Sequence, residues 1–148
     1  MLFRKKFKIN GVTLLYGKYY PSGNHNIVDP IYWFRKTNYK IYDGEELIEK
    51  GIFKNAKELL ESDKYIPFSK TNITKTKQDF IQKYCPEAQS EIEQIIKSEE
   101  DIDFDIAFRI FIEVHPLKDE WDNYVSDRLE KDIIKWCEKN NIPYVIKY

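Results

Sequence analysis

Apolar and basic residues alternate at the beginning of the chain, over residues 3–9. This period of two predicts a half-buried strand. Asn10-Gly11 comes next, a dipeptide typical of a two-residue type I′ turn, so we expect residues 12–20 to return as the second strand of a hairpin. Two further short strands within residues 31–42 would complete an antiparallel N-terminal sheet.

The middle of the chain has the pattern of short helices. Asn55 and Glu58 form a capping pair three positions apart, while Gly51 and Pro86 mark points at which a helix stops. Between residues 63 and 73 we expect a loop. The four predicted helices cover residues 43–50, 55–61, 75–84 and 87–98.

The most regular alternation lies in residues 104–115, FDIAFRIFIEVH, where one face is entirely apolar. We expect a long strand there, then a helix over residues 118–139 with an apolar stripe, and a closing strand over residues 143–147. This order can form a right-handed crossover with a parallel strand pair. The predicted fold class is α+β: an N-terminal antiparallel sheet, a helical middle and a C-terminal strand-helix-strand unit, with a mixed sheet backed by helices.

The length of 148 residues and the hydrophobic content of 42% fit a single globular domain over residues 1–148. No stretch is apolar and long enough for a membrane span, and the basic first ten residues lack the apolar segment of a secretory signal. Cys85 and Cys137 match no zinc or CxxC spacing. We therefore expect a cytoplasmic protein with no cofactor, no metal and no membrane partner.

The charges are balanced over the whole chain but not along it. In total, the chain has 24 Lys and Arg residues and 25 Asp and Glu residues. Residues 1–78 hold 15 basic and 8 acidic residues, a net charge of +7, whereas residues 79–148 hold 9 and 17, a net charge of −8. The second part contains two dense acidic groups: Glu99, Glu100, Asp101, Asp103 and Asp105, and then Asp119, Glu120 and Asp122.

These acidic groups predict a surface for a basic protein partner. Dense carboxylates steer such a partner during association, and the neighbouring Trp121 and Tyr124 could anchor it. An immunity protein or antitoxin that fills the basic groove of a nuclease toxin needs this chemistry; a phage-type inhibitor of a host defence protein is an alternative. The purely structural interpretation places Asp119 and Glu120 in a favourable first helical turn and Trp121 in the core.

A second interpretation is nucleic-acid binding by the predicted N-terminal hairpin. Basic residues share one face of it, and nearby tyrosines and Trp33 could stack on bases. The acidic half would repel a duplex, and lysines on an edge strand also serve to block intermolecular pairing. The sequence therefore argues against a nucleic-acid partner, and the residues of this alternative are Arg4, Lys6, Lys8 and Lys18.

A third interpretation is an enzyme. Asp105, Glu113 and His115 share one face of the predicted strand, and carboxylates near a His can hold Mg²⁺ in a nuclease. Asp105 and Glu113 would, however, be ~26 Å apart in a strand that rises ~3.3 Å per residue, and we find no catalytic motif. We therefore expect a non-enzymatic binding protein.

Overall fold

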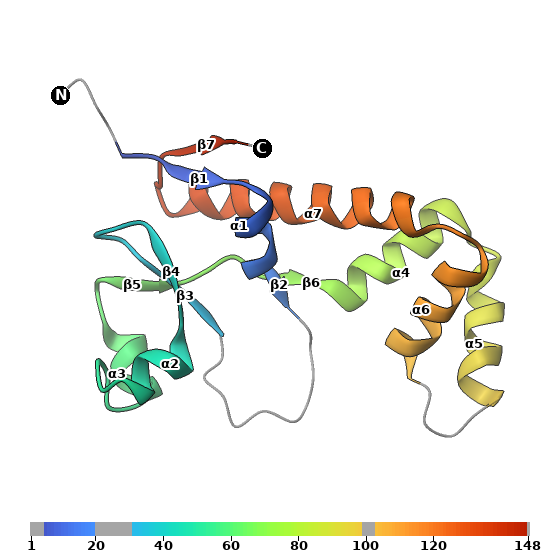
Figure 1. Cartoon of the computed structure of the whole chain (residues 1–148), viewed down its shortest axis with the longest axis horizontal. Coiled ribbons are helices and arrows are strands. Elements are labelled where there is room, and N and C mark those ends of the chain that lie inside the picture. The colour runs from blue at the N-terminus through green and yellow to red at the C-terminus, as the bar shows by residue number, and fades with distance from the viewer. Residues whose placement is uncertain (1–4, 20–30, 99–102, 148) are drawn as a thin grey trace. The chain divides into compact units, whose positions relative to one another are not determined.

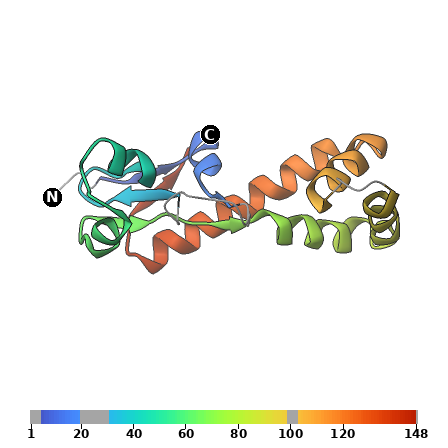
Figure 2. The same cartoon turned by 90° about the horizontal axis from the view of Figure 1, so that it is seen from below.

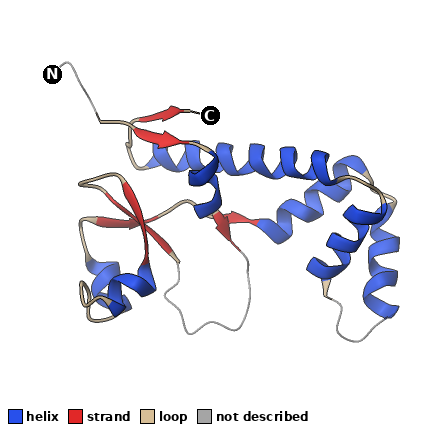
Figure 3. Cartoon of the chain, in the orientation of Figure 1, coloured by secondary structure: helices blue, strands red, loops and turns tan. Residues whose placement is uncertain are grey.

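The computed structural model describes residues 5–19, 31–98 and 103–147 (Figure 1). Its contacts divide the chain into two compact units: unit 1 comprises Met1–Lys18, Ser22–Lys70 and Glu130–Tyr148, and unit 2 comprises Tyr19–Pro21 and Thr71–Leu129. Helices and strands occur together, so the predicted α+β class is confirmed (Figure 3). In the part of the chain described here, no helix is long and apolar enough to cross a membrane.

Unit 1 contains a three-stranded antiparallel sheet in the order β4-β3-β5. Its strands are β3 (Tyr32–Arg35), β4 (Lys40–Asp43) and β5 (Tyr65–Pro67). The two strands predicted within residues 31–42 are thus confirmed. The predicted loop over residues 63–73 is wrong in part, because it contains β5 and the two-residue strand β6 (Thr71–Asn72), which pairs with β2 (Lys18–Tyr19).

Two short helices pack on one face of this sheet, around Trp33, Leu47, Leu59 and Tyr65. They are α2 (Gly44–Glu49) and α3 (Ala56–Glu61). Asn55 caps α3 as predicted, because its side chain accepts a hydrogen bond from the backbone N–H of Glu58 at 3.0 Å.

The predicted N-terminal hairpin is wrong. β1 (Phe7–Ile9) pairs in parallel with β7 (Tyr144–Ile146), and the segment after β1 is the helix α1 (Gly11–Tyr16). Asn10 does not form a turn but caps α1, since its Oδ1 accepts a hydrogen bond from the N–H of Thr13 at 2.9 Å. An Asn before Gly suits a type I′ turn and a helix N-cap equally well, and here the cap prevails.

Unit 2 is built mainly from helices, as Figure 3 shows. They are α4 (Ile73–Tyr84), α5 (Ala88–Ser98), α6 (Phe104–Val114) and the first part of α7 (Lys118–Lys139), whose second part belongs to unit 1. Figure 2 shows α4 and α7 side by side in unit 2. The core of the unit consists of Phe80, Ile81, Ala88, Ile92, Ala107, Phe108, Phe111 and Ile112.

The long strand predicted over residues 104–115 is wrong, because this segment is α6. Asp103 begins the helix by accepting a hydrogen bond from the N–H of Ile106 at 2.9 Å. Phe108, Phe111 and Ile112 are buried, as helical spacing requires, whereas Val114 is 63% exposed. The predicted strand-helix-strand unit is therefore absent from the described part of the chain, although α7 and β7 lie where the sequence predicts a helix and a strand.

The two cysteines should differ in reactivity. Burial raises the pKa of both thiols, to about 12 for Cys137, which is buried in α7, whereas Cys85 is only half-buried at the end of α4. Because the thiolate is the nucleophile, iodoacetamide at about pH 8 should alkylate Cys85 well before Cys137 in the folded protein. Peptide mass spectrometry measures this, with guanidinium-unfolded protein as the control in which both react. Equal rates in the folded protein would contradict the burial of Cys137.

Candidate partner-binding surface

Two turns lie at one end of unit 2. The α4–α5 turn and the α6–α7 turn lie at the same end of the unit in Figures 1 and 2. A side-chain contact joins the α6–α7 turn to the first turn of α5, since Nε2 of His115 lies 2.9 Å from Oε1 of Glu91. We call this end of the unit the acidic end and define it by the carboxylates of Glu87, Glu91, Glu113, Asp119 and Glu120.

Most carboxylates of the acidic end are open to solvent. Glu87, Glu113, Asp119 and Glu120 are exposed, and Glu91 is half-buried beside His115. Neither the side chain of Glu113 nor that of Glu120 makes a hydrogen bond or an ion pair within the residues that the structure describes. Their negative charges are therefore available to a partner.

The two predicted acidic groups do not form one continuous set. Asp103 and Asp105 lie at the beginning of α6, and Asp119 and Glu120 follow its opposite end. Two members of the groups already have ion-pair partners: Asp105 pairs with Lys77 at 2.9 Å and Asp122 pairs with Lys118 at 2.7 Å. The predicted residues Glu99, Glu100 and Asp101 lie outside the described residues.

The predicted anchors Trp121 and Tyr124 contribute to packing. Both are half-buried, and the Trp121 ring lies 4.9 Å from Phe108 and 5.5 Å from Phe80, measured between centroids. The structure thus favours the core interpretation of Trp121. Apolar side chains that are exposed near the acidic end are Tyr84, at 48%, and Val114, at 63%.

Sequence reasoning missed Tyr84 and Val114 as candidate contact residues. Tyr84 ends the helix predicted over residues 75–84, and Val114 belongs to the apolar face of the strand predicted over residues 104–115, which does not form. Each is the last residue of its helix, so a turn follows directly and leaves one side of the residue open. A helix end is thus the signal for such a residue. For Tyr84 this signal is present in the sequence, because the helix predicted over residues 75–84 ends at it. For Val114 it is missing, because residues 104–115 are predicted as a strand.

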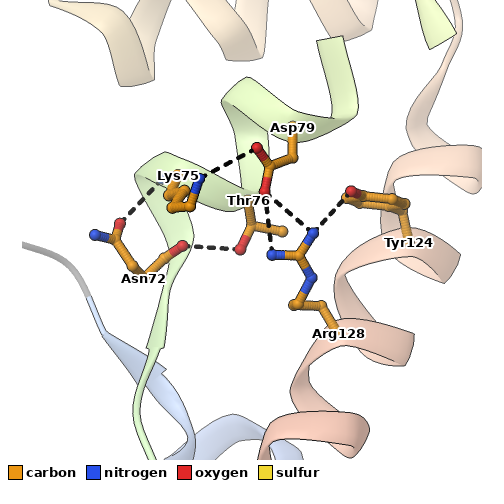
Figure 4. Close-up of polar contacts among 6 residues, drawn as sticks. All are labelled: Asn72, Lys75, Thr76, Asp79, Tyr124 and Arg128. Atoms are coloured by element: carbon orange, nitrogen blue, oxygen red, sulfur yellow. Dashed lines mark hydrogen bonds and ion pairs between the residues drawn. The ribbon is translucent and has the colours of Figure 1, made fainter. Parts of the chain in front are cut away.

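A polar cluster joins α4 to α7 within unit 2 (Figure 4). Both terminal nitrogens of Arg128 donate to Oδ2 of Asp79 at 3.2 Å, and Nη2 also donates to the hydroxyl of Tyr124 at 2.9 Å. Burial acts to lower the pKa of Arg128, but these two partners outweigh it and the pKa is raised. At the start of α4, Thr76 donates to the carbonyl of Asn72 at 2.8 Å. The cluster holds the two helices together and therefore positions the acidic end.

The basic residues of the nucleic-acid interpretation are only partly brought together. Lys6 and Lys8 are exposed at β1, but the neighbouring strand is β7, so Lys18 does not lie across a hairpin from them. Arg4 lies outside the described residues. Trp33, which could have stacked on a base, is only 1% exposed.

The residues of the enzyme interpretation lie at different places. Asp105 is in the first turn of α6 and pairs with Lys77, whereas Glu113 and His115 are at the other end, where His115 contacts Glu91. A helix rises ~1.5 Å per residue, which separates the two ends by ~12 Å. Among the residues that the structure describes, no three His, Cys, Asp or Glu side chains are grouped to hold a metal ion.

Comparisons with known proteins find one matching family model. No curated protein matches the sequence, and no solved structure matches the fold. A family model matches residues 40–148, which begin at β4 and include all of α4, α5, α6 and α7. The chain therefore belongs to the uncharacterised protein family UPF0158.

Proposed function

We propose that this protein is a non-enzymatic binding protein that engages a basic protein partner through the acidic end of unit 2. The observation that carries the proposal is the charge of that unit. Unit 2 has 14 Asp and Glu residues and 7 Lys and Arg residues, a net charge of −7. Unit 1 has 11 Asp and Glu residues and 17 Lys and Arg residues, a net charge of +6. The charge asymmetry of the sequence thus coincides with the two compact units.

The acidic end concentrates this charge on exposed helix ends and turns. Carboxylates without an internal partner keep their full attraction for an approaching cationic surface, which raises the association rate. Tyr84 and Val114 offer exposed apolar area nearby, and such side chains supply binding energy once water is excluded from them. Charge for steering and apolar area for anchoring are the two contributions that a protein-binding surface needs.

The most specific form of the proposal is an inhibitor of the immunity or antitoxin type that neutralises a nuclease toxin. Nucleases bind a polyanion and therefore present a basic groove, which an acidic protein surface can fill. A phage-type inhibitor of a host defence protein would use the same chemistry. The identity of the partner, a nuclease toxin or a host defence protein, distinguishes these two kinds of inhibitor.

Partner capture from nuclease-treated lysate of the native host tests the proposal. Wild-type protein should retain a protein of basic surface, and the triple variant Glu113→Lys, Asp119→Lys, Glu120→Lys should lose most of it. The matched control reverses three exposed glutamates of unit 1, Glu45, Glu58 and Glu61, and should retain it.

Two outcomes of this capture would contradict the proposal. One is a partner with an acidic contact surface, and the other is equal retention by the triple variant and the wild type. Circular dichroism of each variant verifies that the helices are intact, since charge reversal in the first turn of α7 removes a favourable interaction with the helix dipole of about 0.3–1 kcal/mol per residue.

A further inference from the structure

Unit 1 contains a pocket of about 360 Å³ beside the sheet. The pocket lies alongside β4, which is an edge strand of the sheet in the order β4-β3-β5. Residues of α1, β3, β4 and α2 line it. The volume lies within the range of pockets that bind small ligands, ~300–1,000 Å³.

Three tyrosine rings form the aromatic part of the wall: Tyr16, Tyr32 and Tyr42. The rings of Tyr16 and Tyr32 meet edge to face, with centroids 4.9 Å apart and an interplanar angle of 82°. Tyr42 is held at its hydroxyl, which accepts a hydrogen bond from Asn38 at 2.8 Å. The face of an aromatic ring carries negative electrostatic potential and attracts cations.

The charged groups of the wall also favour a cation. Asp43 and Glu46 contribute two carboxylates, and Lys50 contributes one ammonium group. Asp43 is fixed in place, because its Oδ1 caps α2 by accepting from the N–H of Glu45 at 2.9 Å. The ionised side chains of the pocket therefore carry one net negative charge.

The ion pair between Lys50 and Glu46 is too weak to exclude a cationic ligand from the pocket. The Nζ of Lys50 lies 2.7 Å from Oε1 of Glu46, but the two side chains are 64% and 56% exposed. An exposed ion pair of this kind contributes only about 0–1 kcal/mol, because water screens it and two flexible side chains must be ordered. A ligand that binds to Glu46 and to the rings can displace Lys50 into solvent.

We propose that this pocket binds an organic cation, an ammonium group with apolar substituents. The tyrosine rings and the two carboxylates would receive the charge, and Ile41, Leu47 and Ile52 would contact the apolar part. The pocket shares no residue with the acidic end of unit 2, so this inference is independent of the proposed function.

Titration of the full chain with choline tests the inference, followed by NMR of tyrosine rings and backbone amides. Choline should cause saturable shifts of residues in the pocket. Its uncharged analogue of the same shape, 3,3-dimethylbutan-1-ol, should bind about tenfold more weakly, because it lacks the attraction to the rings and carboxylates. Glu46→Gln should weaken choline binding several-fold, and so should Tyr32→Leu.

The control variant is Glu49→Gln, which alters an exposed glutamate of the same helix outside the pocket and should leave binding unchanged. Glu46 is also exposed, so its variant keeps the test valid even where Tyr32→Leu destabilises the sheet. Equal affinity for choline and its uncharged analogue would overturn the inference. Shifts confined to other parts of the chain, or no saturable shift at tens of millimolar choline, would overturn it as well.

Discussion

Phe111→Ala is expected to lower the free energy of unfolding of unit 2 by about 3–5 kcal/mol, the usual cost of emptying a buried Phe site. The Phe111 side chain is 2% exposed and belongs to the core formed with Phe80 and Phe108. Because α6 is helical, its residues 107, 108, 111 and 112 face this core. Denaturant-dependent hydrogen exchange of the amides of α4 and α6 measures the change within unit 2.

Val114→Ala is the matched control on the same helix. Val114 is 63% exposed, so its truncation should change the stability by no more than about 0.5 kcal/mol. A strand over residues 104–115 would place Val114 on the buried face and Phe111 on the mixed face. The reverse order of the two effects would therefore contradict the helical assignment.

Phe34→Ala should destabilise unit 1 by a similar amount, about 3–5 kcal/mol. Phe34 is fully buried in β3, and its ring centroid lies 5.2 Å from that of Phe7 and 5.0 Å from that of Trp136. These contacts join the three-stranded sheet to β1 and to the second part of α7, so one truncation loosens three elements of the unit. Hydrogen exchange of the amides of β3 and β1 reports the loss.

Leu60→Ala provides the comparison for Phe34→Ala, because Leu60 is 58% exposed in α3. Its removal should leave the exchange rates of β3 nearly unchanged. Equal effects of the two substitutions would show that Phe34 is not at the centre of the packing in unit 1.

Helices with a clear local signal could be predicted from the sequence. Asn55 caps α3 as expected, and the predicted helix over residues 118–139 coincides with α7. The local signal differs between the two helices: for α3 it is the cap at Asn55, and for α7 it is the apolar stripe that polar residues interrupt over 22 residues.

The errors arose where one local pattern fits two structures. In FDIAFRIFIEV eight of the eleven residues are apolar, so a period of two and a helical stripe are both present. Asn10-Gly11 likewise suits a turn and a helix start. In each case packing against distant parts of the chain decided the outcome: α6 against α4 and α5, and β1 beside β7.

The sequence could predict the net negative charge of the unit that carries the candidate site, but not which side chains form the site. The acidic half of the sequence became the acidic unit 2 because that unit is almost continuous in sequence, from Thr71 to Leu129. Which carboxylates stay unpaired depends on partners far along the chain, such as Lys77 for Asp105. That pairing has no signature in the spacing of residues, and neither has the burial of Trp121.

The association rate constant with the captured partner, measured by stopped flow at increasing salt, tests the central claim most directly. Electrostatic steering predicts that the rate for the wild type falls at least about tenfold between low and high salt. The variant Glu113→Lys, Asp119→Lys, Glu120→Lys should associate more slowly at low salt and respond less to added salt. A rate that is independent of salt and unchanged in this variant would contradict an acidic docking surface on unit 2.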